Sequence, residues 1–237
     1  MQTVRVSIWC EYPRDVVQVS GPDAASYLQS QVSQELRPLQ VGASAWTFVL
    51  QPTGKIDVLA RVWRTADDTF VLDTDAGFGE TLVARLNRFK IRVKADVTTL
   101  PWTCIAVRGE GASDVAGLAS WGGGVDLLGE SPQPPADATH VGLDELLSTR
   151  IDAVWPQMGA EIVPGETIPA ETGITDVAVS FTKGCYPGQE LVERMDSRGA
   201  TAPRLLQRVR VADGVGAATS QHGEFALAYV KRADLPS

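Results

Sequence analysis

The 237-residue chain has few of the residues that build metal and disulfide sites. It contains three widely spaced cysteines, Cys10, Cys104 and Cys185, and only two histidines, His140 and His222. A disulfide framework or a self-contained zinc site needs clustered ligands, so this spacing argues against both. A cysteine nucleophile of the protease type needs a histidine base. Neither histidine lies in a suggestive context, so the sequence disfavours that chemistry too.

Long apolar runs and clustered positive charge are also missing. No run approaches the roughly 18 apolar residues that a transmembrane helix requires. The N-terminal segment lacks the basic head and apolar core of a signal peptide, so we expect a cytoplasmic protein. The net charge is −8, and no block of lysine and arginine occurs, which disfavours direct nucleic-acid binding. The composition, 44% hydrophobic and 21% charged, is that of a globular chain with a real core.

Hydrophobic patterning predicts a mixture of strands and helices. Strand patterns cover residues 4–9, 15–20, 45–51, 56–64, 69–73, 91–97, 102–107, 205–211 and 225–230, with little predicted between the last two. Helical patterns begin near residues 21, 77, 112, 143 and 189. The turn Pro52-Thr53-Gly54-Lys55 joins two strands into a hairpin, and hairpins imply antiparallel pairing. The expected fold class is therefore α+β. Alternation along 56–64 predicts that Asp57 and Arg61 share one face of their strand.

The segment KGCYPGQE, residues 183–190, carries the most chemistry. Tyr186-Pro187-Gly188-Gln189 fits a type II turn, with a helix beginning near Gln189. Cys185 would then lie just before a helix N-terminus and two residues after Lys183, and both features favour a thiolate. From the local sequence alone, a second interpretation stays open, in which Cys185 is a small buried filler of a tight loop.

This segment resembles the K-G-C-Y-x-G-Q-E signature of the YgfZ family. These proteins are folate-binding relatives of the glycine-cleavage T-protein, an aminomethyltransferase, and the family includes a mitochondrial iron–sulfur assembly factor. Segments beginning at Val19, Leu50, Arg150 and Gly216 resemble the family's N-terminal strand–helix entry, its G-K-x-D hairpin, its R-x-E-A-G-x-P segment and its T-S…A-L-A-Y-V pattern. The resemblance therefore extends over nearly the whole chain.

The resemblance implies a T-protein-like fold. Two ferredoxin-like α/β lobes would surround a central folate channel and carry a small C-terminal β-barrel. The aminomethyltransferase-like region would span residues 1–203, with one lobe formed by about 1–100 and 151–203 and the other by 101–150. The barrel would span 204–237, and we expect it to be truncated because the segment 211–216 is very short.

The resemblance also implies a function. It indicates a tetrahydrofolate-binding accessory protein in iron–sulfur cluster assembly or repair, without classical turnover, that indirectly supports tRNA modification. Its cofactor would be tetrahydrofolate or a one-carbon derivative, and its partners iron–sulfur proteins or cluster-assembly factors. Cys185 is the implied key thiol, assisted by Lys183. The implied folate contacts are Asp57, Arg61, Asp152, Tyr186, Gln189 and Glu190.

Two departures from the family pattern bear on the chemistry. Asp152 stands where the family usually has glutamate, which keeps the charge that would pair with a pterin but shortens the side chain by one methylene. Asp57 is followed by Val58, whereas the T-protein hairpin commonly carries paired aspartates. Aminomethyl transfer is therefore disfavoured, although a folate-dependent one-carbon transferase, or a module that only senses folate, stays an alternative.

Purely structural roles are the other interpretation of the implied contacts. Asp57 and Arg61 could line the solvent-facing side of a strand. Glu190 could be only the first-turn carboxylate of its helix. Tyr186 could pack in its own turn instead of stacking on a ligand.

Overall fold

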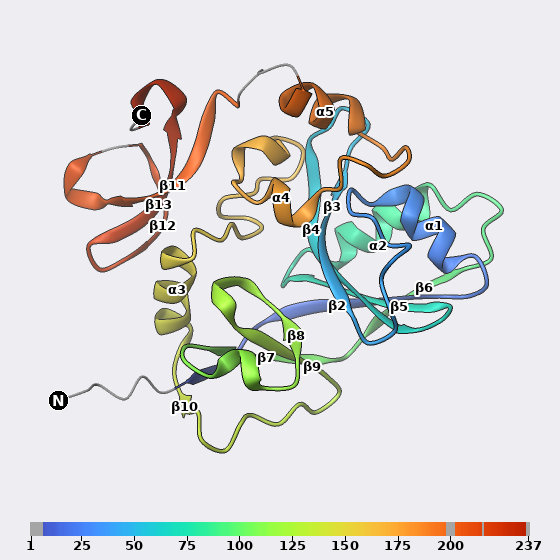
Figure 1. Cartoon of the computed structure of the whole chain (residues 1–237), viewed down its shortest axis with the longest axis horizontal. Coiled ribbons are helices and arrows are strands. Elements are labelled where there is room, and N and C mark those ends of the chain that lie inside the picture. The colour runs from blue at the N-terminus through green and yellow to red at the C-terminus, as the bar shows by residue number, and fades with distance from the viewer. Residues whose placement is uncertain (1–6, 198–201, 215, 236–237) are drawn as a thin grey trace.

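The computed structural model describes residues 7–197, 202–214 and 216–235, which form three β-sheets and a few short helices (Figure 1). The strands are β1 Ile8–Glu11, β2 Arg14–Ser20, β3 Ser44–Leu50, β4 Ile56–Ala66, β5 Thr69–Asp75, β6 Asp96–Leu100, β7 Thr103–Arg108, β8 Leu118–Ala119, β9 Val125–Gly129, β10 Thr139–His140, β11 Arg204–Arg210, β12 Ala218–His222 and β13 Phe225–Lys231. The α-helices are α1 Ala24–Gln31, α2 Gly79–Arg88, α3 Leu143–Asp152, α4 Thr175–Ala178 and α5 Gln189–Ser197. The predicted α+β class is confirmed.

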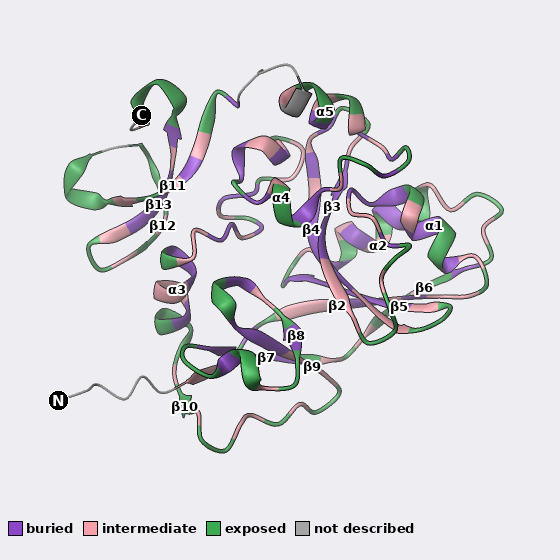
Figure 2. Cartoon of the chain, viewed as in Figure 1, coloured by how far each residue is buried: buried purple, intermediate pink, exposed green. Residues whose placement is uncertain are grey.

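The first sheet has the strand order β3-β4-β5-β2-β6, and all its pairings are antiparallel. Its strands carry apolar side chains at every second position on the face that packs against α1 and α2. Val58, Ala60 and Val62 of β4 meet Leu28 of α1 and Leu82 of α2 there, and all five are fully buried. Buried residues accordingly concentrate in the strands of this sheet (Figure 2).

The second sheet, of order β10-β1-β7-β9-β8, lies against the other side of the first. Their shared core contains Trp46 and Leu59 from the first sheet, Cys104 from the second, and Trp121 and Trp155 from connecting segments. Strands β3 and β4 of the first sheet are therefore covered on both faces, whereas the edge strand β6 exposes Asp96, Thr98 and Thr99 to solvent.

The third sheet, of order β11-β13-β12, stands at the C-terminal end beside α3 (Figure 1). Ile151 of α3 packs against Leu206 of β11 and Leu227 of β13. The prediction of little structure between the last two strands is wrong, because β12 forms there and pairs with β13. The predicted division of the chain into regions 1–203 and 204–237 stays a prediction.

Three further local predictions need comment. The segment after Ala112 forms one 3-10 turn and the short β8 instead of a helix. Gly117 allows this close pairing, since a Cβ there would lie 2.8 Å from the Leu127 side chain. Residues 4–6 of the first predicted strand lie outside the described residues. A β-bulge at the end of the β3–β4 pairing breaks the expected alternation in β4, as the site geometry below shows.

Candidate functional site

The signature segment 183–190 lies on the β3–β4 hairpin turn, so two motifs that are far apart in the sequence meet. Gly188 has φ 84°, and a Cβ on it would lie 2.5 Å from the Gln51 carbonyl oxygen and 2.9 Å from Gly54 Cα. Gly54 has φ 85°, and a Cβ there would lie 2.4 Å from the Leu191 Cβ. Only glycine at both positions permits this contact, which fixes where α5 begins.

Lys183 anchors the segment at its other end. Its ammonium donates hydrogen bonds to the carbonyl oxygens of Gln29, Val32 and Gln34, at 2.8, 2.5 and 2.9 Å. These carbonyls belong to the C-terminal end of α1 and the residues after it, where a cation also suits the helix dipole. Burial lowers the pKa of Lys183 to about 8. All three protons of the ammonium are thus used on the backbone.

Cys185 is the accessible thiol of the protein. It is exposed, whereas Cys10 and Cys104 are buried in the core. Burial raises the pKa of both core thiols, and Asp126 and Asp73 add to the rise at Cys104. The interpretation of Cys185 as a buried filler is therefore wrong, and of the three cysteines it is the one presented to a reagent or partner.

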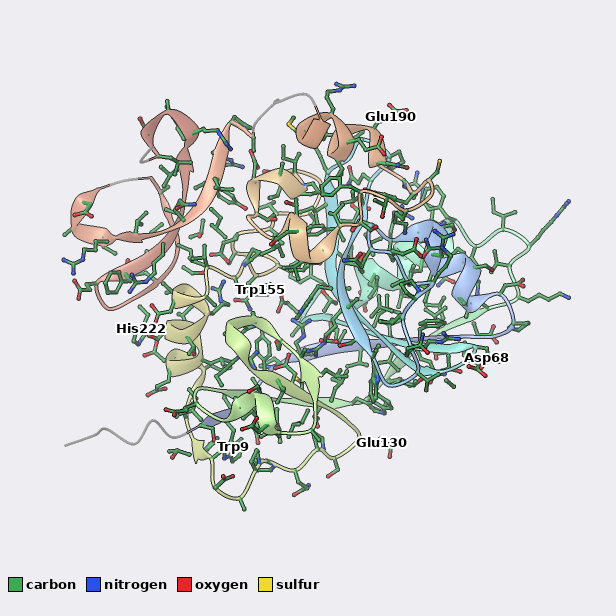
Figure 3. The ribbon with its side chains drawn as sticks, viewed as in Figure 1. Trp9, Asp68, Glu130, Trp155, Glu190 and His222 are labelled. Carbon is green, nitrogen blue, oxygen red and sulfur yellow. The ribbon has the colours of Figure 1, made fainter. Side chains whose placement is uncertain are left out.

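The other signature residues divide between core and surface. Tyr186 is 7% exposed and belongs to the core shared by the first two sheets. Its buried hydroxyl has no hydrogen-bond partner among the described residues, and burial raises its pKa to about 12. The Gln189 side-chain oxygen accepts a long hydrogen bond from the Tyr186 backbone N–H, at 3.4 Å. Glu190 is exposed on α5 at the periphery of the molecule (Figure 3).

Asp57 lies close to the signature segment but faces α2. Its carboxylate accepts a hydrogen bond from the Gln51 side chain at 2.8 Å and lies 3.4 Å from Arg85 of α2. Arg85 in turn donates to the Leu50 carbonyl oxygen at 2.8 Å. Asp57 is the extra residue of a bulge in β4, opposite Val49 and Leu50, and it turns to this face, so the prediction that it shares a face with Arg61 is wrong.

Arg61 points the other way, into a fully buried ion network. Its guanidinium binds Asp73 of β5 at 3.0 Å and Asp126 of β9 at 2.9 Å. Asp126 also pairs with Arg108 at 2.9 Å, and Asp73 pairs with Arg14 at 2.8 Å. Burial alone would raise the pKa of Asp126, but Arg61 and Arg108 outweigh it and hold that pKa below its ordinary value. This network joins the first sheet to the second.

Asp152 lies at the junction with the third sheet. Its side chain is 61% exposed and pairs with Arg208 of β11 at 2.9 Å. The sequence did not reveal that its neighbour Arg150 pairs with buried Glu161 at 2.7 Å. Thr219 and Ser220 donate to the same Glu161 carboxylate at 2.7 and 2.6 Å. The sequence shows the motifs around Arg150 and Ser220, but no local pattern indicates that the two segments lie in contact in the fold.

The structure therefore brings Asp57, Tyr186 and Gln189 into one region and places Arg61 and Asp152 in two others. Three of the expected folate contacts do not converge on one cavity: Asp57 faces α2, Arg61 is enclosed by carboxylates, and Asp152 faces the third sheet.

A different cavity, of about 260 Å³, offers chemistry that suits a pterin ring. Tyr12 and Trp121 line it with their rings nearly perpendicular, and Leu146 and Gln157 complete its wall. The buried Trp121 indole N–H has no hydrogen-bond acceptor among the described residues, and the partly exposed Gln157 side chain also lines the cavity. An aromatic wall with one unsatisfied donor and a side-chain amide fits a planar heterocycle that offers both acceptors and donors.

Two classes of feature are missing from the described part of the chain. Residues 7–197, 202–214 and 216–235 contain no group of three or more His, Cys, Asp or Glu side chains that could hold a metal ion. None of the described helices is long and apolar enough to cross a bilayer.

Comparison with known proteins supports this reading of the fold. Residues 14–121 match the family model of the GCVT N-terminal domain. A crystal structure of the glycine cleavage system aminomethyltransferase T from Bartonella henselae matches with a TM-score of 0.78 at 18% identity, covering 96% of this chain and 79% of that one. At this identity the match establishes the fold alone.

Curated relatives are similar over most of the chain. An uncharacterized protein of Haemophilus influenzae is 28% identical over 194 residues, 78% of this chain and 67% of that protein. The mitochondrial iron-sulfur cluster assembly factor IBA57 of Homo sapiens is 27% identical, over 81% of this chain and 63% of that protein. Its homolog in Phaeosphaeria nodorum is 27% identical, over 88% and 56%. The chain spans between little more than half and two thirds of these relatives.

These matches confirm the expected likeness to the T-protein superfamily, while the narrower YgfZ assignment and a cytoplasmic location stay predictions. The chain thus carries a match to the GCVT N-terminal domain over residues 14–121 and, as a whole, has the α+β fold of the glycine cleavage T-protein.

Proposed function

We propose that this protein is an accessory factor in iron–sulfur cluster assembly or repair, with Cys185 as its working thiol. The single observation that carries the proposal is the exposure of Cys185 on a segment fixed at both ends. Lys183 holds one end through three backbone carbonyls, and Gly188 holds the other against the hairpin turn. A thiol presented in this way can meet an iron or sulfur atom carried by a partner protein.

The similarity to proteins named as iron-sulfur cluster assembly factors supports this proposal. The partners would then be iron–sulfur proteins or assembly factors, and an effect on tRNA modification would follow indirectly, through cluster-dependent enzymes. The contacts of Lys183 support a positioning role for it within the proposal. Because its protons are used on backbone carbonyls, we assign it the task of positioning the Cys185 segment.

Tetrahydrofolate is the ligand that the T-protein fold suggests. We propose that Tyr12, Trp121 and Gln157 would hold its pterin ring in the 260 Å³ cavity. The bound cofactor would supply a one-carbon carrier. Asp57, Arg61 and Asp152 have other partners in this structure, so their folate contacts rest on the family resemblance alone. The first test is equilibrium binding of tetrahydrofolate, which Trp121→Phe should weaken by removing the indole donor while keeping an aromatic wall.

The decisive experiment for the cysteine is complementation. In cells lacking the protein, a cluster-dependent enzyme is assayed under oxidative stress after return of the native chain, Cys185→Ala or Thr182→Ala. Thr182 is an exposed neighbour in the same loop and serves as the matched control. We expect the native chain and Thr182→Ala to restore activity and Cys185→Ala to fail at equal protein level. Equal restoration by all three would refute the role of Cys185.

The alternative function, a folate-dependent one-carbon transferase, makes the opposite prediction. Asp57 would then orient the reacting amine, so folate-dependent turnover should survive Cys185→Ala and disappear in Asp57→Asn. A module that only senses folate would bind the ligand and complement with both substitutions. Purified variants assayed in parallel separate these cases.

A further inference from the structure

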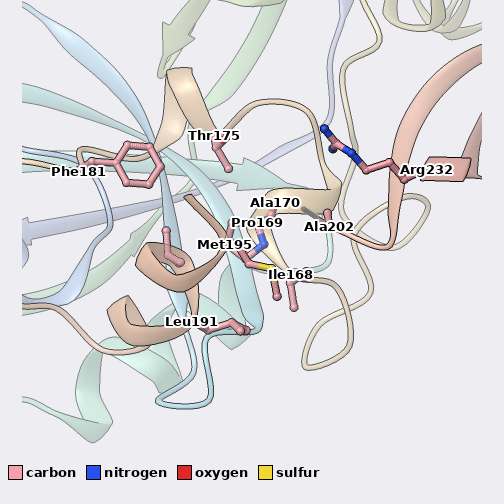
Figure 4. Close-up of a pocket in the computed structure, with 10 residues that line it drawn as sticks. Ile168, Pro169, Ala170, Thr175, Phe181, Leu191, Met195, Ala202 and Arg232 are labelled. Carbon is pink, nitrogen blue, oxygen red and sulfur yellow. The ribbon is translucent and has the colours of Figure 1, made fainter. Parts of the chain in front are cut away.

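An apolar groove of about 220 Å³ lies beside the signature segment, between α5 and the residues that precede α4 (Figure 4). Ile168 lines it from just before the 3-10 turn Pro169–Glu171, Phe181 from the loop before Lys183, and Leu191 and Met195 from α5. The groove is therefore built by residues on both flanks of the segment that presents Cys185.

The lining residues are mostly apolar, and polar atoms share the surface that the groove leaves open to solvent. Phe181 is 40% exposed, which is unusual for an aromatic side chain with an apolar recess next to it. Met195 has a flexible, polarizable side chain of the kind that adapts to different partners. Such a recess, with an exposed aromatic at its edge, is typical of a surface that receives an apolar side chain from another molecule.

The groove also contains one positively charged side chain. Arg232 is the only charged side chain among the described lining residues, and Figure 4 shows it at one side of the recess. Its backbone N–H donates to the Pro203 carbonyl oxygen at 3.0 Å, which holds the backbone of Arg232 near Ala202, while the Arg232 residue stays exposed. Three other arginines of the described C-terminal region pair with carboxylates: Arg204 with Glu171, Arg208 with Asp152 and Arg210 with Glu224. The Arg232 side chain has no such partner among the described residues.

We propose that this groove binds the C-terminal end of a partner protein, with a bulky apolar side chain in the recess and the terminal carboxylate on Arg232. With a volume of about 220 Å³, the groove has room for one or two side chains of a partner. A chain end places an apolar side chain and an anion within a few ångströms of each other, which matches the lining. The inference rests on the proposed function, because a partner held here would lie next to the Cys185 segment.

The test uses fluorescein-labelled tetrapeptides that begin with Gly-Gly-Leu and end in Leu, Phe or Trp. Each is made with a free C-terminal carboxylate and as the C-terminal amide. Fluorescence anisotropy should show that at least one acid peptide binds and that its amide binds about tenfold more weakly, because the charge-assisted hydrogen bond to Arg232 is lost.

Matched variants locate the binding. Arg232→Gln should reduce binding of the acid peptide to the level of the amide, whereas Lys231→Gln removes a neighbouring charge outside the groove and should change nothing. Phe181→Ser should weaken both peptides about tenfold, whereas Val177→Ser, which truncates a comparably exposed side chain outside the lining, should weaken neither.

Failure of every acid peptide to bind at millimolar concentration would overturn the proposal. The proposal would also be overturned if the acid and amide forms of a peptide bound with equal affinity and Arg232→Gln left both affinities unchanged. Cys185→Ala should bind the peptides as the native chain does. If Cys185→Ala fails to complement in cells but still binds the peptides, the groove is supported independently of the cysteine. If the native chain binds no peptide but complementation still requires Cys185, only the groove proposal is refuted.

Discussion

At the scale of single residues, Gly188 decides whether Cys185 is held in place. Its left-handed backbone and the 2.5 Å approach to the Gln51 carbonyl oxygen leave no room for a side chain. We expect Gly188→Ala to destabilise the protein by about 2–4 kcal/mol, because it adds a left-handed penalty to a steric clash. Gly184→Ala is the control, since a Cβ there would meet nothing within 4 Å. Urea unfolding should separate the two variants, and equal stabilities would contradict the close contact.

At the scale of elements, Lys183 ties the signature segment to the end of α1, and this tie should depend on pH. The pKa of Lys183 is about 8 in the native protein and returns to the ordinary lysine value of 10.5 on unfolding. Between these values the unfolded chain binds more protons, so the free energy of unfolding should rise with pH, by about 1–3 kcal/mol in total. Below pH 8 both states are protonated, and the contribution is constant.

Lys183→Met isolates this contribution. The variant should be less stable at every pH, because three carbonyl oxygens lose their donor, and its stability should lack the rise between pH 8 and 10.5 that the native chain shows. Denaturant unfolding at several pH values measures both slopes. Parallel curves for the two proteins would show that the native pKa of Lys183 is not lowered.

At the scale of the whole molecule, the buried ion network holds the first two sheets together through Asp126. Asp126→Ala leaves both Arg61 and Arg108 without a carboxylate that they share, so we expect a loss of about 3–5 kcal/mol in the free energy of unfolding. Asp67→Ala removes an aspartate that is 96% exposed and pairs loosely with Arg64, and should cost under about 1 kcal/mol. A similar cost for both variants would mean that the network contributes little to the joining of the sheets.

Much of this architecture could be predicted from local patterns. The hairpin at Pro52–Lys55, the helix beginning at Gln189 and the α+β class follow from turn residues and hydrophobic periodicity. The bulge at Asp57 could not be predicted, because a single extra residue in a strand leaves no signature in the alternation. The helix expected after Ala112 failed because tertiary pairing with β9 outweighs a weak helical pattern broken by glycine.

For the site, the sequence by itself identified the segment 183–190. Its glycines, proline, lysine and cysteine have backbone preferences and chemical groups that do not depend on the fold. Only the tertiary structure decided what each residue does. It directed Lys183 to the backbone of α1, enclosed Arg61 between two aspartates, and left Cys185 exposed while the other cysteines became core. The reason is physical: burial and ion pairing depend on which distant segments come together, and the partners of these residues lie far away along the chain.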